Sequence, residues 1–197
     1  MQTGALERAI RIQQIAILYI SIEAMIALVA AMAAGSVALM GFGLDSVIEV
    51  TSAGVVLWRL QRNTARAESL ALRVVGACFL VLAVYVAWEG VEALWRHEAP
   101  HGSALGMVLA AASLVAMPLL ARVKRKAAGS VGSGAMAADA RQSDLCAWLS
   151  AILLAGLALN ALFGWWWTDP AAALAMAPVI AREGVGAWRG KTCACGD

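Results

Sequence analysis

Charged residues are scarce in this sequence of 197 residues. They make up 14% of the chain, against about 25% in soluble proteins, while hydrophobic residues make up 62%, against about 45–50%. This shortage excludes an ordinary soluble domain and predicts an integral membrane protein. The length suffices for about six spans of about 20 residues each, joined by short loops. The net charge of +2 is scattered over several loops, so there is no basic patch for nucleic acid.

Histidine is scarcer still. The two histidines, His97 and His101, lie in one stretch with Pro100, which argues against a helix there, so we expect ordinary loop histidines. A membrane-embedded enzyme would need a nucleophile with its base or a His/Glu metal centre, and no Glu-x-x-His spacing occurs. The sequence therefore predicts a protein that is not an enzyme and holds no permanently bound cofactor.

The four cysteines fall into two kinds. Cys78 and Cys146 lie in apolar stretches, where a lone cysteine is usually a small buried hydrophobe. Cys193 and Cys195 form a Cys-x-Cys pair, which either holds a soft metal ion or is simply a reactive tail. We therefore expect a transmembrane domain over residues 1–191 and a short cytoplasmic tail over residues 192–197. The start is polar, and the first apolar stretch is followed directly by further apolar stretches rather than by a small-residue cleavage site, so no cleaved signal is indicated.

Six apolar stretches predict six transmembrane helices and an all-α fold. They cover about residues 12–34, 36–58, 70–91, 104–121, 136–163 and 169–188. Every Lys and Arg except Arg96 and Arg141 falls at the amino end, in the 59–73 or 122–126 loop, or near the carboxyl end. The positive-inside rule then places both termini in the cytoplasm. We expect a multi-pass protein of a cell membrane, most simply a bacterial inner membrane.

Two further expectations concern helix ends. Residues 127–134 contain several Gly and Ser residues and predict a flexible linker after the basic loop. The dipeptide Asp169-Pro170 predicts the start of the last helix, because Asp caps a helix and Pro suits its first turn.

Acidic side chains inside the apolar stretches are the main functional signal. Asp45 and Glu49 are four residues apart, so their carboxylates share one face of a helix. An unpaired carboxylate in a membrane costs at least about 2.5 kcal/mol, so a proton, an arginine or a divalent cation must offset these charges. A salt bridge with Arg141 is the purely structural alternative. Glu23 is either an ion or proton ligand or a carboxyl hydrogen-bonded to a neighbouring helix.

The fifth span carries further candidate ligands. At about 1.5 Å per residue, Glu49 and Asp144 both lie about 12–15 Å from the cytoplasmic ends of their helices. We therefore expect Asp144 to face an ion together with Glu49, and Asp139 to be a gate or entrance ligand nearer the cytoplasm. Asp139 and Asp144 diverge by about 140° on a helix, so both cannot face one ion. The competing face of the same helix consists of Asp139, Gln142, Ser143 and Cys146.

Four motifs spread along the chain form a set. They are Gly-Ser-Val-Ala-Leu at 35–39, Asp45-x-x-x-Glu49, Ala-Asp-Ala-Arg-Gln-Ser-Asp at 138–144 and Asp-Pro-Ala-Ala-Ala at 169–173. Over essentially the whole chain, this set resembles the cation diffusion facilitators, which are six-helix metal/proton antiporters and usually homodimers. The resemblance implies efflux of zinc or a similar divalent ion, with the metal ion and protons as substrates. It also implies that Asp45, Glu49 and Asp144 bind the ion, in a homodimer within the lipid bilayer.

The sequence departs from the family pattern in two places. Ala140 stands where the family usually has His or Asp, so Asp139 or Gln142 must complete a four-ligand site. The sequence ends soon after the sixth span, so we expect a minimal form without the family's cytoplasmic C-terminal domain. An oxygen-rich site favours zinc, our leading expectation, or manganese or iron(II) over copper(I). A non-transporting membrane metal sensor or assembly subunit is the alternative function.

Overall fold

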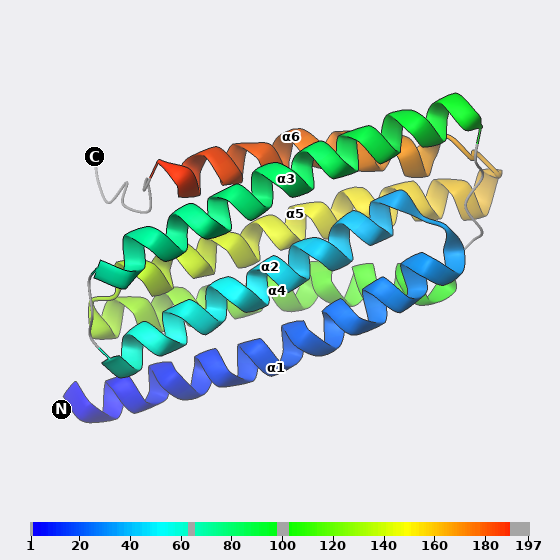
Figure 1. The fold of residues 1–197 in the computed structure, drawn as a ribbon. Coiled ribbons are helices and arrows are strands. Elements are labelled where there is room, and N and C mark those ends of the chain that lie inside the picture. Colours follow the sequence, from blue (N-terminus) through cyan, green and yellow to red (C-terminus); the bar gives the residue numbers. More distant parts are fainter. Residues whose placement is uncertain (1, 63–65, 98–102, 190–197) are drawn as a thin grey trace, which may run out of the picture.

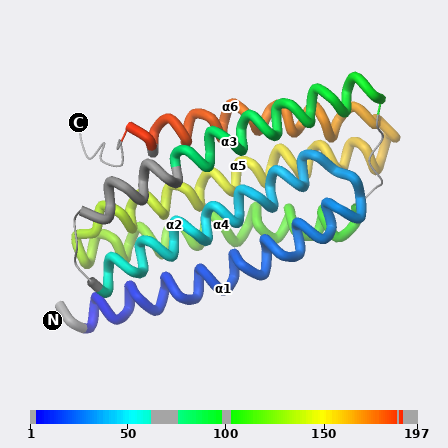
Figure 2. Tube along the Cα trace, in the orientation of Figure 1, coloured from blue at the N-terminus to red at the C-terminus, as the bar shows by residue number. Residues whose placement is uncertain are grey.

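The fold is an antiparallel bundle of long helices, as Figure 1 shows. The computed structural model describes residues 2–62, 66–97 and 103–189, and within them it contains helices and no strands. The same path is drawn as a tube in Figure 2. The helices are α1 (Gln2–Ala34), α2 (Val37–Arg62), α3 (Arg66–Arg96), α4 (Ala104–Val131), α5 (Gly134–Phe163) and α6 (Thr168–Trp188). The expected all-α fold with six helices is confirmed.

Five of these six helices are long and apolar enough to cross a membrane. The qualifying segments are Gly4–Ala34, Val37–Gln61, Gly76–Arg96, Ala104–Val131 and Gly134–Phe163. Helix α6 does not qualify by itself; it carries Asp169, Arg182 and Glu183, and it lies along α3 (Figure 1). Outward-facing side chains of the bundle are apolar, as contact with lipid requires, and Met25 and Val84 are about 70% exposed. The chain is therefore a multi-pass membrane protein.

The start of α1 and the end of α6 lie at the same end of the bundle. The end of α2, the start of α3 and the α4–α5 connection are there too (Figure 1). This arrangement is the one expected for an even number of spans. The Cys193/Cys195 tail and His101 lie outside the described residues.

Helix α4 is longer than the sequence predicted. The expected basic loop at 122–126 and most of the expected linker at 127–134 are helical, and α4 ends only at Val131. Lys, Arg and Ala are strong helix formers, and they carry the helix through this stretch. Gly132 then ends it in the left-handed conformation, with φ 64°, and Ser133 caps α5 through the Met136 N–H. The linker prediction was wrong, and Lys124 consequently belongs to a helix.

Helices α3 and α6 approach each other at glycines. A Cβ atom added at Gly76 of α3 would lie 2.6 Å from the Trp188 nitrogen and 2.9 Å from the Gly184 carbonyl oxygen. Small residues allow such close contact between membrane helices, where van der Waals packing drives association. This contact packs α6 against the bundle, although α6 is not one of the five helices that qualify as spans.

Asp169 connects the ends of two helices. We expected it to cap α6, but α6 begins at Thr168, and the Asp169 carboxylate instead caps α2. It accepts hydrogen bonds from Ser36 Oγ at 2.5 Å and from the Val37 N–H at 3.0 Å. The first N–H groups of a helix have no partner within it, which explains why this acid is held there. The expectation of an α6 cap is thus corrected to a cap between helices.

Candidate cation site

A stripe of small polar side chains runs along the buried face of α5. Asp139, Ser143, Cys146 and Ser150 follow at intervals of three or four residues, so they share one helix face. All four are buried. The face of α5 that points into the bundle is therefore the competing face, and not the one that carries Asp144.

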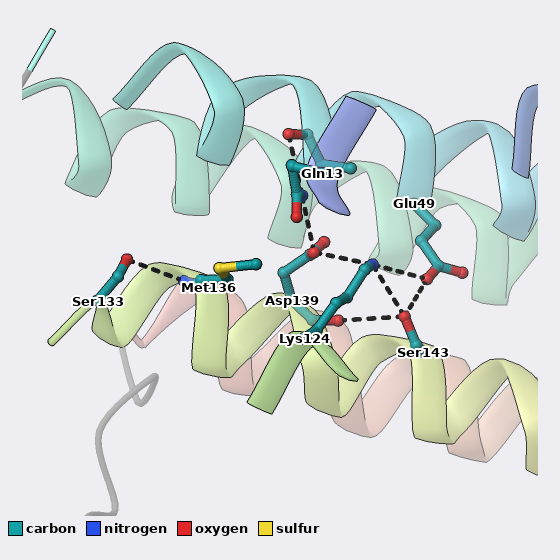
Figure 3. Close-up of polar contacts among 8 residues, drawn as sticks. Gln13, Glu49, Lys124, Ser133, Met136, Asp139 and Ser143 are labelled. Atoms are coloured by element: carbon teal, nitrogen blue, oxygen red, sulfur yellow. Dashed lines mark hydrogen bonds and ion pairs between the residues drawn. The ribbon is translucent and has the colours of Figure 1, made fainter. Parts of the chain in front are cut away.

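The centre of the site is an ion-pair cluster around Lys124 of α4, which is fully buried. Its Nζ atom lies 2.8 Å from Asp139 Oδ2 and 3.7 Å from Glu49 Oε1. The ammonium also donates to Ser143 Oγ at 3.0 Å, and this hydroxyl donates to Glu49 Oε1 at 2.7 Å (Figure 3). One ammonium group thus bridges carboxylates from α2 and α5.

Helix α1 contributes Gln13 to the same cluster. Its Nε2 atom donates to Asp139 Oδ2 at 2.8 Å and to the Ala53 carbonyl at 3.2 Å (Figure 3). A buried ion pair is favourable only when further hydrogen bonds satisfy its other lone pairs. In the described part of the chain, however, Asp139 Oδ1 and Glu49 Oε2 are buried without a hydrogen-bond partner. Each carboxylate therefore keeps one oxygen for a proton, a water molecule or a cation.

Asp144 is not part of this cluster, so the expected pairing of Asp144 with Glu49 is wrong. Its carboxylate binds Arg125 of α4, and its side chain is 34% exposed. The reason is the rotation of about 140° between positions 139 and 144, which sends the two acids to different sides of α5. Lys124 and Arg125 are adjacent on α4. Lys124 forms an ion pair with Asp139, and Arg125 forms one with Asp144. Asp139, which we expected to be a gate, faces the interior of the bundle and pairs with Lys124. The metal-binding role of either acid stays a prediction.

Asp45 lies one turn before Glu49 on α2 and is 4% exposed. It lines a small cavity together with Gln142 and Glu183 of α6. The Gln142 Nε2 atom is buried and has no hydrogen-bond partner among the described residues. Asp45 and Gln142 therefore share a pocket of their own, and Glu183 is an acid of that pocket that the sequence did not single out.

The structure also shows the contacts of Glu23 and the surroundings of Arg141. The Glu23 carboxylate accepts a hydrogen bond from Ser113 of α4, so a contact with a neighbouring helix is what the structure contains. Arg141 is exposed and lies near Glu183, and the cation beside Glu49 is Lys124 rather than Arg141. Across the ranges that the structure describes, no three His, Cys, Asp or Glu side chains are grouped closely enough to hold a metal ion. The inner carboxylates are instead gathered around an ammonium group.

Sequence comparison identifies the family. The sequence matches the cation efflux transmembrane domain over residues 14–189, which is most of the chain. The chain belongs to the cation efflux family. This cation efflux protein is also similar to an uncharacterized transporter of Synechocystis sp., with 28% identity over 71% of this chain and 49% of that protein. The match therefore spans about half the length of that curated relative. The family is one of transporters, in agreement with the expectation that the chain is not an enzyme.

Sequence reasoning missed two residues of this cation efflux protein's inner cluster, Lys124 and Gln13. The sequence places Lys124 in the expected basic loop at 122–126, and Gln13 has no charge that would mark it as a site residue. A signal for Lys124 exists, because it continues a stripe at intervals of three or four residues. The buried members of that stripe on α4 are Gly106, Ala110, Ser113, Met117, Ala121, Lys124 and Ala128.

Proposed function

We propose that this chain exports a divalent metal cation in exchange for protons. Zinc is the leading substrate, with manganese and iron(II) as alternatives. Membership of the cation efflux family supports transport, and buried acids from two helices support a cation as the cargo. The observation that carries the proposal is that Glu49 and Asp139 each keep one buried oxygen without a hydrogen-bond partner in the described chain. Oxygen donors of this kind suit hard and borderline divalent ions.

The proposed ligands come from α2 and α5. Asp45 and Glu49 share one face of α2, Asp139 projects toward Lys124 from α5, and the Gln142 side chain lies in the cavity beside Asp45. Carboxylates bind a divalent ion only when they are deprotonated, so protons and the cargo compete for the same oxygens. A proton gradient can then drive release of the cargo on one side of the membrane.

The proposed setting is a homodimer in a bacterial inner membrane, with both termini in the cytoplasm. The start of α1 and the end of α6 lie at the same end of the bundle in Figure 1. The same end carries Arg59 of α2 and the basic run from Arg122 to Lys126 of α4. Such an excess of positive charge on one side is typical of the cytoplasmic face.

Uptake into sealed proteoliposomes tests the proposal. Vesicles containing the purified chain would be given Zn²⁺, Mn²⁺, Fe²⁺ or Co²⁺ with and without a pH gradient, and empty vesicles would be the control. We expect saturable uptake of at least one ion that becomes faster when protons move in the opposite direction. An uptake rate that is the same with and without the pH gradient would exclude proton coupling. Absence of uptake of every ion would overturn the proposal.

A membrane metal sensor or assembly subunit is the second candidate. It is favoured by the inner cluster itself, in which Lys124 already neutralises part of the acidic charge. Such a protein would bind a divalent ion in the same vesicles, if at all, without moving it across the membrane. Binding without flux would therefore select this candidate.

A further inference from the structure

Lys124 is unusual because a lysine is almost never fully buried. Its side chain has no exposed surface, and its Nζ atom is surrounded by Asp139, Ser143 and Glu49. The neighbouring basic residues of α4, Arg125 and Lys126, are exposed. The burial of Lys124 is thus specific to this position and does not reflect the helix as a whole.

The ammonium holds the two carboxylates unequally. It is in direct contact with Asp139 at 2.8 Å, whereas Glu49 lies 3.7 Å away and is reached mainly through the Ser143 hydroxyl. Figure 3 shows Lys124 lying between these acids, with Ser143 beside it. Glu49 is therefore the carboxylate that the ammonium holds less tightly.

We infer that Lys124 is a tethered counter-cation, which occupies the charge position between Glu49 and Asp139 and competes with the cargo cation for them. The inference rests on the proposed function. A divalent ion bound to either carboxylate would lie close to the ammonium, and like charges at such distances in a low-dielectric interior repel strongly. The cargo must therefore displace the ammonium, and the flexible four-carbon stem of lysine permits that movement.

The competing explanation is that Lys124 is only a structural ion pair. The two explanations predict different effects of removing the Lys124 charge on the affinity for the cargo. If the Lys124 ammonium competes with the cargo, removing its charge should raise the affinity of the carboxylates for a divalent ion. A structural residue that is removed leaves affinity unchanged, or lowers it by loosening the arrangement of the acids.

Equilibrium binding of Zn²⁺ and of Mn²⁺ to the purified full chain in lipid nanodiscs tests the inference. Lys124→Met removes the charge and keeps most of the volume, and we expect it to tighten binding of at least one ion by about tenfold or more. Lys126→Met is the matched control, because this exposed lysine lies two residues away on the same helix, and it should leave binding unchanged. Lys124→Arg keeps the charge and should not tighten binding.

A second variant covers the case in which Lys124→Met does not fold. Lys124→Gln also lacks the charge but keeps a polar amide that can donate hydrogen bonds, and it should tighten binding in the same direction. If the wild type binds and transports an ion while the folded neutral variant binds no tighter, the counter-cation inference fails and the proposed function stands. If neither the wild type nor the neutral variants bind or move any ion, both fail.

Discussion

Replacing Asp139 with asparagine should impair this protein far more than the same replacement at Asp144. Asp139 is 2% exposed and pairs with the fully buried Lys124, and breaking a buried ion pair costs about 3–5 kcal/mol. We expect about 3 kcal/mol, the lower end, because Glu49 stays near the ammonium and the new amide oxygen still accepts hydrogen bonds. Asp144 and Arg125 are 34% and 46% exposed, and such pairs contribute about 0.2–1 kcal/mol.

Thermal unfolding in detergent and proteoliposome uptake measure the two consequences separately. Asp139→Asn should lower the unfolding temperature and reduce uptake at least about tenfold, because Asp139 is a proposed ligand and loss of a group that merely orients metal ligands already costs about 10–100-fold. Asp144→Asn should leave both quantities close to wild type. The opposite order, with Asp144→Asn abolishing uptake and Asp139→Asn tolerated, would refute the register of α5 and restore the depth assignment made from the sequence.

Three further predictions concern the acids of α2, residues 192–197 and the cap formed by Asp169. Asp45→Asn and Glu49→Gln each remove a charge with almost no change in volume, so each should abolish uptake in a folded protein; wild-type uptake would exclude that residue from the cation site. Deletion of residues 192–197, which lie outside the described part of the chain, should leave flux largely intact, and complete loss would assign the tail to transport or assembly. Asp169→Ala removes the acceptor at the start of α2 and should lower the free energy of unfolding by about 0.5–2 kcal/mol, without changing Zn²⁺ affinity; a change in affinity would contradict a purely capping role.

The number of helices could be predicted because the membrane leaves few choices. A segment that crosses lipid must satisfy its backbone hydrogen bonds internally, so each long apolar stretch becomes a helix. The end of α4 could not be predicted from the same signal. Residues 122–133 have the charge and the glycines of a loop, yet α4 continues to Val131 and brings Lys124 inside the bundle. Its acidic partners on α2 and α5 are what make burial of that lysine favourable, and they are distant in sequence.

The rotation of α5 was the second point that depth alone did not decide. Glu49 and Asp144 are at similar depths, but depth does not say which way a side chain points around its helix. Apolar residues occur all around α5, so its hydrophobic pattern does not mark one face. The regular recurrence of Asp139, Ser143 and Cys146 is a better guide, because small polar residues are enriched where membrane helices contact each other. The motif pair in α2 needed no such choice, since Asp45 and Glu49 are four residues apart.

The proposed orientation of the protein in the membrane does not depend on the charge of Lys124. Lys124 was one of the charges that placed the 122–126 stretch in the cytoplasm, but its ammonium faces Asp139 and Glu49 inside the bundle. The positive-inside balance counts charges in loops and near helix ends, and it does not depend on this one residue. Its neighbours Arg122, Arg125 and Lys126 are exposed at the same end of α4 and still give that end its positive charge. The proposed orientation thus stands without Lys124, and the charge of Lys124 remains to offset the acids of the site.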